Sequence, residues 1–175
     1  MGVVIVIAII AIVSIILFTS NTNADIPPIT NVNSIKGIVM FLNQGRIYPF
    51  YTRMNFVRFK KAVEQAGLDN GSFKLAVMRY EMTGDAPIFM WDVSNECIES
   101  ITIRLNKKGI VFSISIKIKD FKEHTKELLN EMAAKFGEPT SMDDFNIKWE
   151  EGGGGINVDV GGSITIYDKL ITPNA

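Results

Sequence analysis

The residues that could form a catalytic pair are few, because the chain contains one histidine, His124, and one cysteine, Cys97. Nucleophilic catalysis by such a pair needs the nucleophile within reach of the imidazole base. His124 stands in the first turn of a predicted helix among charged neighbours, which is typical of a solvent-facing side chain. Cys97 precedes an isoleucine-rich stretch and is expected to be a small packed side chain. We therefore expect no catalytic pair, and no metal or cofactor site, since zinc needs three or four ligands.

Two pairs of adjacent carboxylates, Asp143-Asp144 and Glu150-Glu151, lie on either side of Trp149 in loop-like or strand-end positions. Two carboxylates that flank a glycosidic bond can hydrolyse it, so a carboxylate-dependent hydrolase is an alternative hypothesis. Adjacent acids are more often simply solvated. The four glycines that follow are not a phosphate-binding loop, because the required Lys-Ser/Thr and helix are missing. A non-enzymatic protein is therefore the favoured expectation.

A basic and aromatic stretch between residues 46 and 61 is the segment whose composition suggests partners. Its aromatic side chains could pack under a sheet while its charges face water. It could instead lie against anionic lipid headgroups, or form a protein-binding patch rich in arginine and tyrosine. The candidate binding residues are Arg46, Tyr48, Tyr51, Arg53, Arg58, Lys60 and Lys61.

Charge is unevenly distributed along the chain, although the net charge is only −1. Residues 26–63 contain six basic and no acidic side chains, which gives +6. Residues 64–175 contain 12 basic and 18 acidic side chains, which gives −6. A basic front and an acidic back argue against a nucleic-acid partner, because such proteins show a sustained basic face.

The N-terminal run from Val3 to Phe18 contains no charged residue and predicts a membrane-targeting element. As a helix the run would rise about 24 Å, a little short of a hydrocarbon core of roughly 30 Å. It is also slightly longer than a usual signal-peptide core. Small polar residues then lead to a plausible cleavage site at Ala24. A cleaved signal peptide and a retained single-pass anchor therefore both stay open.

These features predict a signal peptide or membrane anchor at 1–24, a proline-containing linker at 25–36 and one α+β domain at 37–175. An exported, extracytoplasmic domain in the periplasm or cell envelope is the preferred location. A cytoplasm-facing anchored domain is the alternative, because basic residues near an anchor favour the cytoplasmic side.

Helical spacing predicts helices at 54–66 and after Asp120, where Glu123 would complete a capping box. Ser72 is a plausible N-cap for another helix at 73–82. Alternation of Phe73 and Leu75 would also fit a strand there. We choose the helix because strong helix formers dominate that segment.

Alternating apolar residues predict six strands, at 89–93, 101–105, 110–118, 145–149, 156–160 and 164–166. A four-residue turn after Leu105 would pair Ile103 with Phe112, so that the apolar faces coincide. A three-residue loop at 161–163 would pair Val160 with Ile164.

The expected fold is α+β, an antiparallel sheet with helices on one face and the order α-α-β-β-β-α-β-β-β. The half-repeat α-β-β-β resembles BamE-like and β-lactamase-inhibitor-like modules, which are small exported assembly factors or protein inhibitors. This resemblance lies in the order of elements and carries over no site residue. The leading hypothesis is a non-enzymatic, exported or membrane-anchored protein-binding module, either an envelope assembly accessory or an inhibitor or immunity-type protein. The alternatives are the hydrolase and a membrane-surface protein that binds anionic lipid through residues 46–61.

Overall fold

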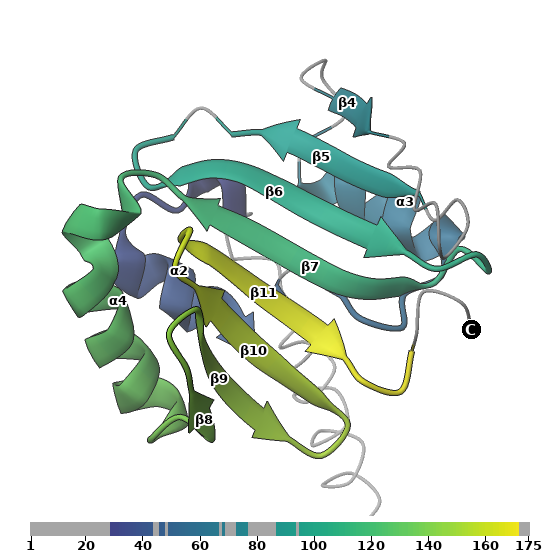
Figure 1. Cartoon of the computed structure of the whole chain (residues 1–175). Coiled ribbons are helices and arrows are strands. Elements are labelled where there is room, and N and C mark those ends of the chain that lie inside the picture. Colours follow the sequence, from purple (N-terminus) through teal and green to yellow (C-terminus); the bar gives the residue numbers. More distant parts are fainter. Residues whose placement is uncertain are drawn as a thin grey trace, which may run out of the picture.

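The computed structural model describes residues 29–43, 46–47, 49–66, 68, 73–76, 87–93 and 95–171. These residues form antiparallel sheets and three α-helices, which confirms the predicted α+β class (Figure 1). The predicted N-terminal signal or anchor helix lies outside them. Within the described part of the chain, no helix is both long and apolar enough to cross a membrane.

An eight-stranded antiparallel sheet organises the molecule, with the strand order β4-β5-β6-β7-β11-β10-β9-β8. Each half of this sheet is a four-stranded meander that follows one helix, and the last strands of the two halves pair at the centre. The predicted half-repeat had three strands, so each half contains one strand more than expected. The strands are β4 (Phe73–Ala76), β5 (Ile88–Asp92), β6 (Ile98–Leu105), β7 (Val111–Ile118), β8 (Ser141–Met142), β9 (Asn146–Glu151), β10 (Gly154–Asp159) and β11 (Ser163–Asp168).

The helix predicted at 73–82 is wrong over its described part, because Phe73–Ala76 is strand β4. This strand pairs with β5, where Phe73 lies opposite Trp91 and Leu75 lies opposite Phe89. Pairing with an existing sheet edge outweighs helix propensity here, and the alternation of Phe73 and Leu75 was the better signal. Residues 77–82 lie outside the described part.

The β6–β7 hairpin is confirmed, but its predicted register is wrong by two residues. Ile103 pairs with Ile114 instead of Phe112. Leu105 pairs with Val111, so the turn has five residues instead of the predicted four, and a bulge before the next pair adds a second extra residue to β7. A bulge cannot be read from alternation alone. Since the slip is even, the apolar residues still face the same side.

The β10–β11 hairpin is also confirmed with a register two residues from the predicted one, because Val158, not Val160, pairs with Ile164. Strand β10 ends at Asp159, one residue before the predicted end of the strand at Val160. The Ser163 amide donates to Asp159 Oδ1 at 3.0 Å across the loop. Val160 is therefore exposed at the tip of the turn.

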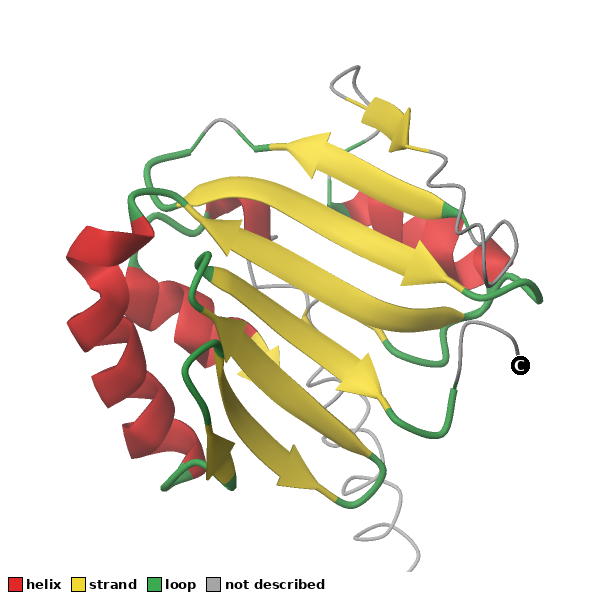
Figure 2. Cartoon of the chain, viewed as in Figure 1, coloured by secondary structure: helices red, strands yellow, loops and turns green. Residues whose placement is uncertain are grey.

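One hydrophobic core joins one face of this sheet to all three helices, α2 (Ile35–Phe41), α3 (Phe56–Gln65) and α4 (Phe121–Phe136). Isoleucines of the central strands form the sheet side of the core, in rows such as Ile103, Ile114 and Ile166. Thr102, Ser115 and Thr165 alternate with these and face the other side. Figure 2 shows α2 and α3 behind the sheet and no helix in front of it.

Residues 29–36, which are part of the segment predicted to be a linker, belong to the described fold. Ile29, Val32 and Ile35 are buried in the core, and the Ser34 hydroxyl caps α2 by accepting from the Gly37 amide at 3.0 Å. After α2, β1 (Leu42–Asn43), β2 (Arg46–Ile47) and β3 (Phe50–Tyr51) form a small second sheet. This sheet leads directly into α3.

Helix α4 begins where it was predicted, but the capping box is wrong. Asp120 has a left-handed backbone (φ +47°) and its side chain makes no capping hydrogen bond. At the other end, Lys135 Nζ donates to the carbonyls of Val39 (2.9 Å), Met40 (2.8 Å) and Leu42. These carbonyls belong to the C-terminal end of α2, so Lys135 ties the two helices together.

Candidate binding surface

The predicted patch at 46–61 divides into three parts in the structure. In the first part, Arg46 and Arg58 meet at Tyr51. The guanidinium carbon of Arg46 lies 6.0 Å from the centre of the Tyr51 ring, and Arg58 Nη1 donates to the Tyr51 hydroxyl at 3.2 Å. Tyr48 lies outside the described residues.

Arg53 forms the second part alone, because it turns away from the other basic residues and pairs with Asp168 at the end of β11. Its Nε lies 2.6 Å from Asp168 Oδ2, and its backbone is left-handed (φ +69°). Burial raises the pKa of Asp168, but the hydrogen bond from Arg53, the Leu170 amide and the Arg53 charge together hold it below its ordinary value. Arg53 therefore fastens the loop before α3 to the main sheet.

The third part is the outer surface of α3, where Lys60 and Lys61 stand beside exposed apolar side chains. Phe56 is 41% exposed and Val57 is 67% exposed. Lys60 Nζ lies 5.0 Å from the centre of the Phe56 ring, within the range of a cation–π contact. Among the described residues, neither lysine forms an ion pair.

An apolar groove of about 310 Å³ runs between α3 and β5 next to these lysines. Its lining includes Phe56, Phe59, Phe89 and Trp91, together with Lys60. The aromatic rings pack on one another, with 4.7 Å between the centres of Phe59 and Phe89 and 6.2 Å between those of Phe59 and Trp91. Since Phe59 and Trp91 are buried core residues, the floor of this α3–β5 groove is fixed by the fold.

Two further lysines, Lys107 and Lys108, belong to the turn between β6 and β7, and this turn packs against the start of α3. The next residue, Gly109, packs against Phe56, since a Cβ at Gly109 would lie 3.5 Å from Phe56 Cβ. Asn55 also bridges to Ile110. Both lysines are exposed, in a turn from a distant part of the chain.

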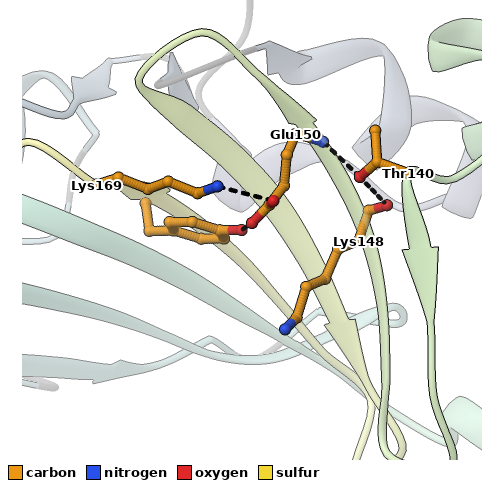
Figure 3. A network of polar contacts seen from close by, with 5 residues as sticks. Thr140, Lys148, Glu150 and Lys169 are labelled. Carbon is orange, nitrogen blue, oxygen red and sulfur yellow. Dashed lines mark hydrogen bonds and ion pairs between the residues drawn. The ribbon is translucent and has the colours of Figure 1, made fainter.

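Glu150, one of the carboxylates of the hydrolase hypothesis, lies on strand β9 of the main sheet in a polar network (Figure 3). Tyr167 donates its hydroxyl proton to Glu150, and Lys169 Nζ lies 2.7 Å from Glu150 Oε2. These two contacts, Lys169 first, hold the pKa of Glu150 below its ordinary value. A general acid needs a raised pKa, so this environment does not favour that role for Glu150.

Asp143 serves as a local structural residue, because its Oδ1 accepts the amides of Phe145 and Asn146, each at 2.8 Å. These hydrogen bonds, that of Phe145 first, lower the pKa of Asp143. From Asn146 to Glu150 the extended strand β9 already spans roughly 13 Å. Paired glycosidase carboxylates are about 5–9.5 Å apart, so this backbone separation does not favour Asp144 and Glu150 as such a pair.

The remaining chemical candidates also have structural roles. Cys97 is buried in the core, and burial raises the pKa of its thiol. His124 lies on α4 with its Nδ1 3.7 Å from Glu127 Oε2. Trp149 donates its indole proton to the Gly137 carbonyl at 2.9 Å and so fixes the end of α4. In the described part of the chain, no group of three or more His, Cys, Asp or Glu side chains could hold a metal ion.

The α3–β5 groove, with Lys60 in its lining, is therefore the candidate site. No protein-family model, curated protein or solved structure matches the chain.

Proposed function

We propose that the protein is a non-enzymatic binding module that acts by contact with another protein. Its α3–β5 groove would receive an apolar side chain of the partner, while the surrounding lysines would pair with acidic residues beside that side chain. The observation that carries this proposal is the preformed aromatic groove with Lys60 and exposed Phe56 in its lining, and with exposed Val57 next to Phe56 on α3.

The arrangement has the features of a protein-binding surface. Such surfaces combine a central apolar pocket, filled by an anchor residue of the partner, with a polar border. Phe59 and Trp91 are fixed in the core, so little ordering of the groove opposes binding. The exposed lysines Lys61, Lys107 and Lys108 would add electrostatic attraction and increase the association rate.

A flat anionic bilayer fits this surface less well. It would contact the protruding Val57 and the lysines, but it would leave the concave aromatic floor unfilled. The unfilled floor supports a protein partner over a lipid surface.

The N-terminal hydrophobic run supports placing this module outside the cytoplasm, either released by cleavage or held at the envelope by a retained anchor. In the retained case the module would act next to the membrane.

Site-specific photo-crosslinking in native membranes tests the proposal. A photoreactive residue replaces exposed Val57 beside the groove, or exposed Met40 on α2 as a matched control. We expect a light-dependent protein adduct at position 57 and none at position 40. Adducts of position 57 with phospholipid alone, or the same adducts at both positions, would contradict the proposal.

A further inference from the structure

A second exposed apolar element lies at the edge of the sheet far from the α3–β5 groove. The turn from Met142 to Phe145 joins β8 to β9 and presents Met142 (73% exposed) and Phe145 (67% exposed). Between them stand two aspartates. We call this element the acidic turn.

The acidic turn has a fixed shape. Asp143 Oδ1 accepts the Phe145 and Asn146 amides at 2.8 Å each, and the Asp143 amide donates to the Asn146 carbonyl at 2.9 Å. The Phe145 carbonyl accepts the Val160 amide at 3.0 Å from the β10–β11 turn. Phe145 therefore protrudes from an ordered backbone, which lowers the entropy lost on binding.

The acidic turn and the α3–β5 groove are complementary in charge and in shape. One presents an aromatic side chain preceded by Asp143 and Asp144. The other is an aromatic-lined groove of about 310 Å³, which has room for a phenyl ring. Its lining includes Lys60, with Glu64 one turn further along α3, and exposed Lys61 follows Lys60 on the same helix. Opposite charges around a buried aromatic anchor are the usual composition of a specific contact.

The two elements cannot meet within one molecule. In the main sheet, β5 and β9 are separated by β6, β7, β11 and β10. Five strand-to-strand steps of about 4.8 Å place the groove strand and the strand after the acidic turn roughly 24 Å apart. A contact between them must join two copies of the chain.

We infer that the acidic turn of one copy docks in the α3–β5 groove of a second copy, with Phe145 in the groove and Asp143 and Asp144 against Lys60 and Lys61. This inference rests on the proposed function of the groove and identifies its partner as a second copy. The two surfaces in contact are different, so the contact is heterologous and each dimer keeps one free groove and one free turn. The same contact can then repeat into a chain of copies.

Thiol crosslinking of full-length protein in native membranes tests this inference, using the variants Lys60→Cys and Asp144→Cys. The native Cys97 is buried, and each single variant controls for it. Neither single variant should form dimers by itself. Co-expressed, the two variants should form a crosslinked dimer and no larger species. The double variant Lys60→Cys/Asp144→Cys should give a ladder of higher oligomers.

Adding Phe145→Ala should reduce the crosslinked dimer by roughly ten-fold or more, the effect of removing an anchor residue from an interface. Met40→Ala removes an equally exposed apolar side chain elsewhere and should leave the yield unchanged.

Dimers formed by Lys60→Cys alone would indicate a symmetric contact and overturn the inference. Crosslinking of Lys60→Cys to a different protein would overturn the second copy as partner but keep the proposed function of the groove. Absence of any crosslink at Lys60 would contradict both.

Discussion

The substitution Gly162→Ala should destabilise the protein strongly, because this glycine supports the packing of α4 on the β10–β11 turn. Gly162 has φ +82°, a conformation that side chains rarely adopt. A Cβ added there would also lie 2.4 Å from Phe121 Cβ and 2.5 Å from Phe121 Cγ. These atoms are at the base of the Phe121 side chain, so the start of the helix itself must move.

The expected cost is the sum of two contributions. An alanine in the left-handed region costs about 1 kcal/mol relative to glycine. Overpacking against Phe121 adds about 1–3 kcal/mol. The total of about 2–4 kcal/mol is a large part of the 5–15 kcal/mol by which domains are usually stable.

Gly152→Ala is a matched control, because Gly152 also has positive φ (+59°) in a β-turn but no atom lies within 4 Å of its added Cβ. It should cost only about 1 kcal/mol, the conformational contribution. Urea unfolding followed by tryptophan fluorescence measures both variants. In the double variant Gly162→Ala/Phe121→Ala, the two losses should sum to more than the observed loss, since the clash with Phe121 Cγ and the ring is removed and only the clash with Cβ remains. Equal effects of the two glycine substitutions, or strict additivity with Phe121→Ala, would refute the reasoning.

Two further predictions concern single contacts. Arg53→Met should raise the pKa of Asp168 and reduce the free energy of unfolding at pH 7. The pKa of Asp168 is lowered by folding, so this contribution is complete above its unfolded pKa of about 3.9 and is lost as pH falls through the folded pKa. The difference from the wild type in urea unfolding should therefore shrink below about pH 4, and a pH-independent difference would contradict this assignment. Trp149→Phe removes the hydrogen bond to the Gly137 carbonyl and leaves that carbonyl without this donor. It should reduce the free energy of unfolding by about 1–2 kcal/mol, measured by urea titration, and an unchanged value would show that water replaces the indole.

The strands of the sheet could be predicted from the sequence because one face is apolar and the other is polar. Rows such as Ile103 and Thr102 alternate in the sequence as they do in the sheet. The registers could not be predicted, because alternation shows which residues share a face but neither the length of the β6–β7 turn nor the bulge beside it. Both predicted registers are wrong by two residues, an even number, so the side chains predicted for the apolar face do lie on that face.

Strand β4 was mispredicted because Phe73–Ala76 contains residues that suit either structure, and the neighbouring strand decides between them. Asp120 was mispredicted for a different reason. Its sequence position fits an N-cap, but the left-handed backbone that follows β7 turns the side chain away from the helix amides.

The candidate site was predicted only in part. Residues 46–61 contain the basic and aromatic side chains of α3, but the sequence could not separate Arg53, whose partner Asp168 is 115 residues away. Lys107 and Lys108 were absent from the predicted patch, because only the β6–β7 hairpin and the Asn55–Ile110 bridge bring their turn next to the start of α3. Contacts between residues far apart in the sequence depend on how the strands pair, so no local sequence pattern predicts them.

Affinity purification of the full-length protein from native membranes tests the central claim, the binding of a protein at the α3–β5 groove, most directly. Lys60→Glu/Lys61→Glu reverses two charges beside the groove, and Lys36→Glu/Lys119→Glu reverses two exposed charges elsewhere. Circular dichroism melting first confirms that both variants are folded. We predict that the co-purified protein, including a differently tagged second copy, is lost with the groove variant and retained with the control. Retention of the same partners by the groove variant would contradict the account.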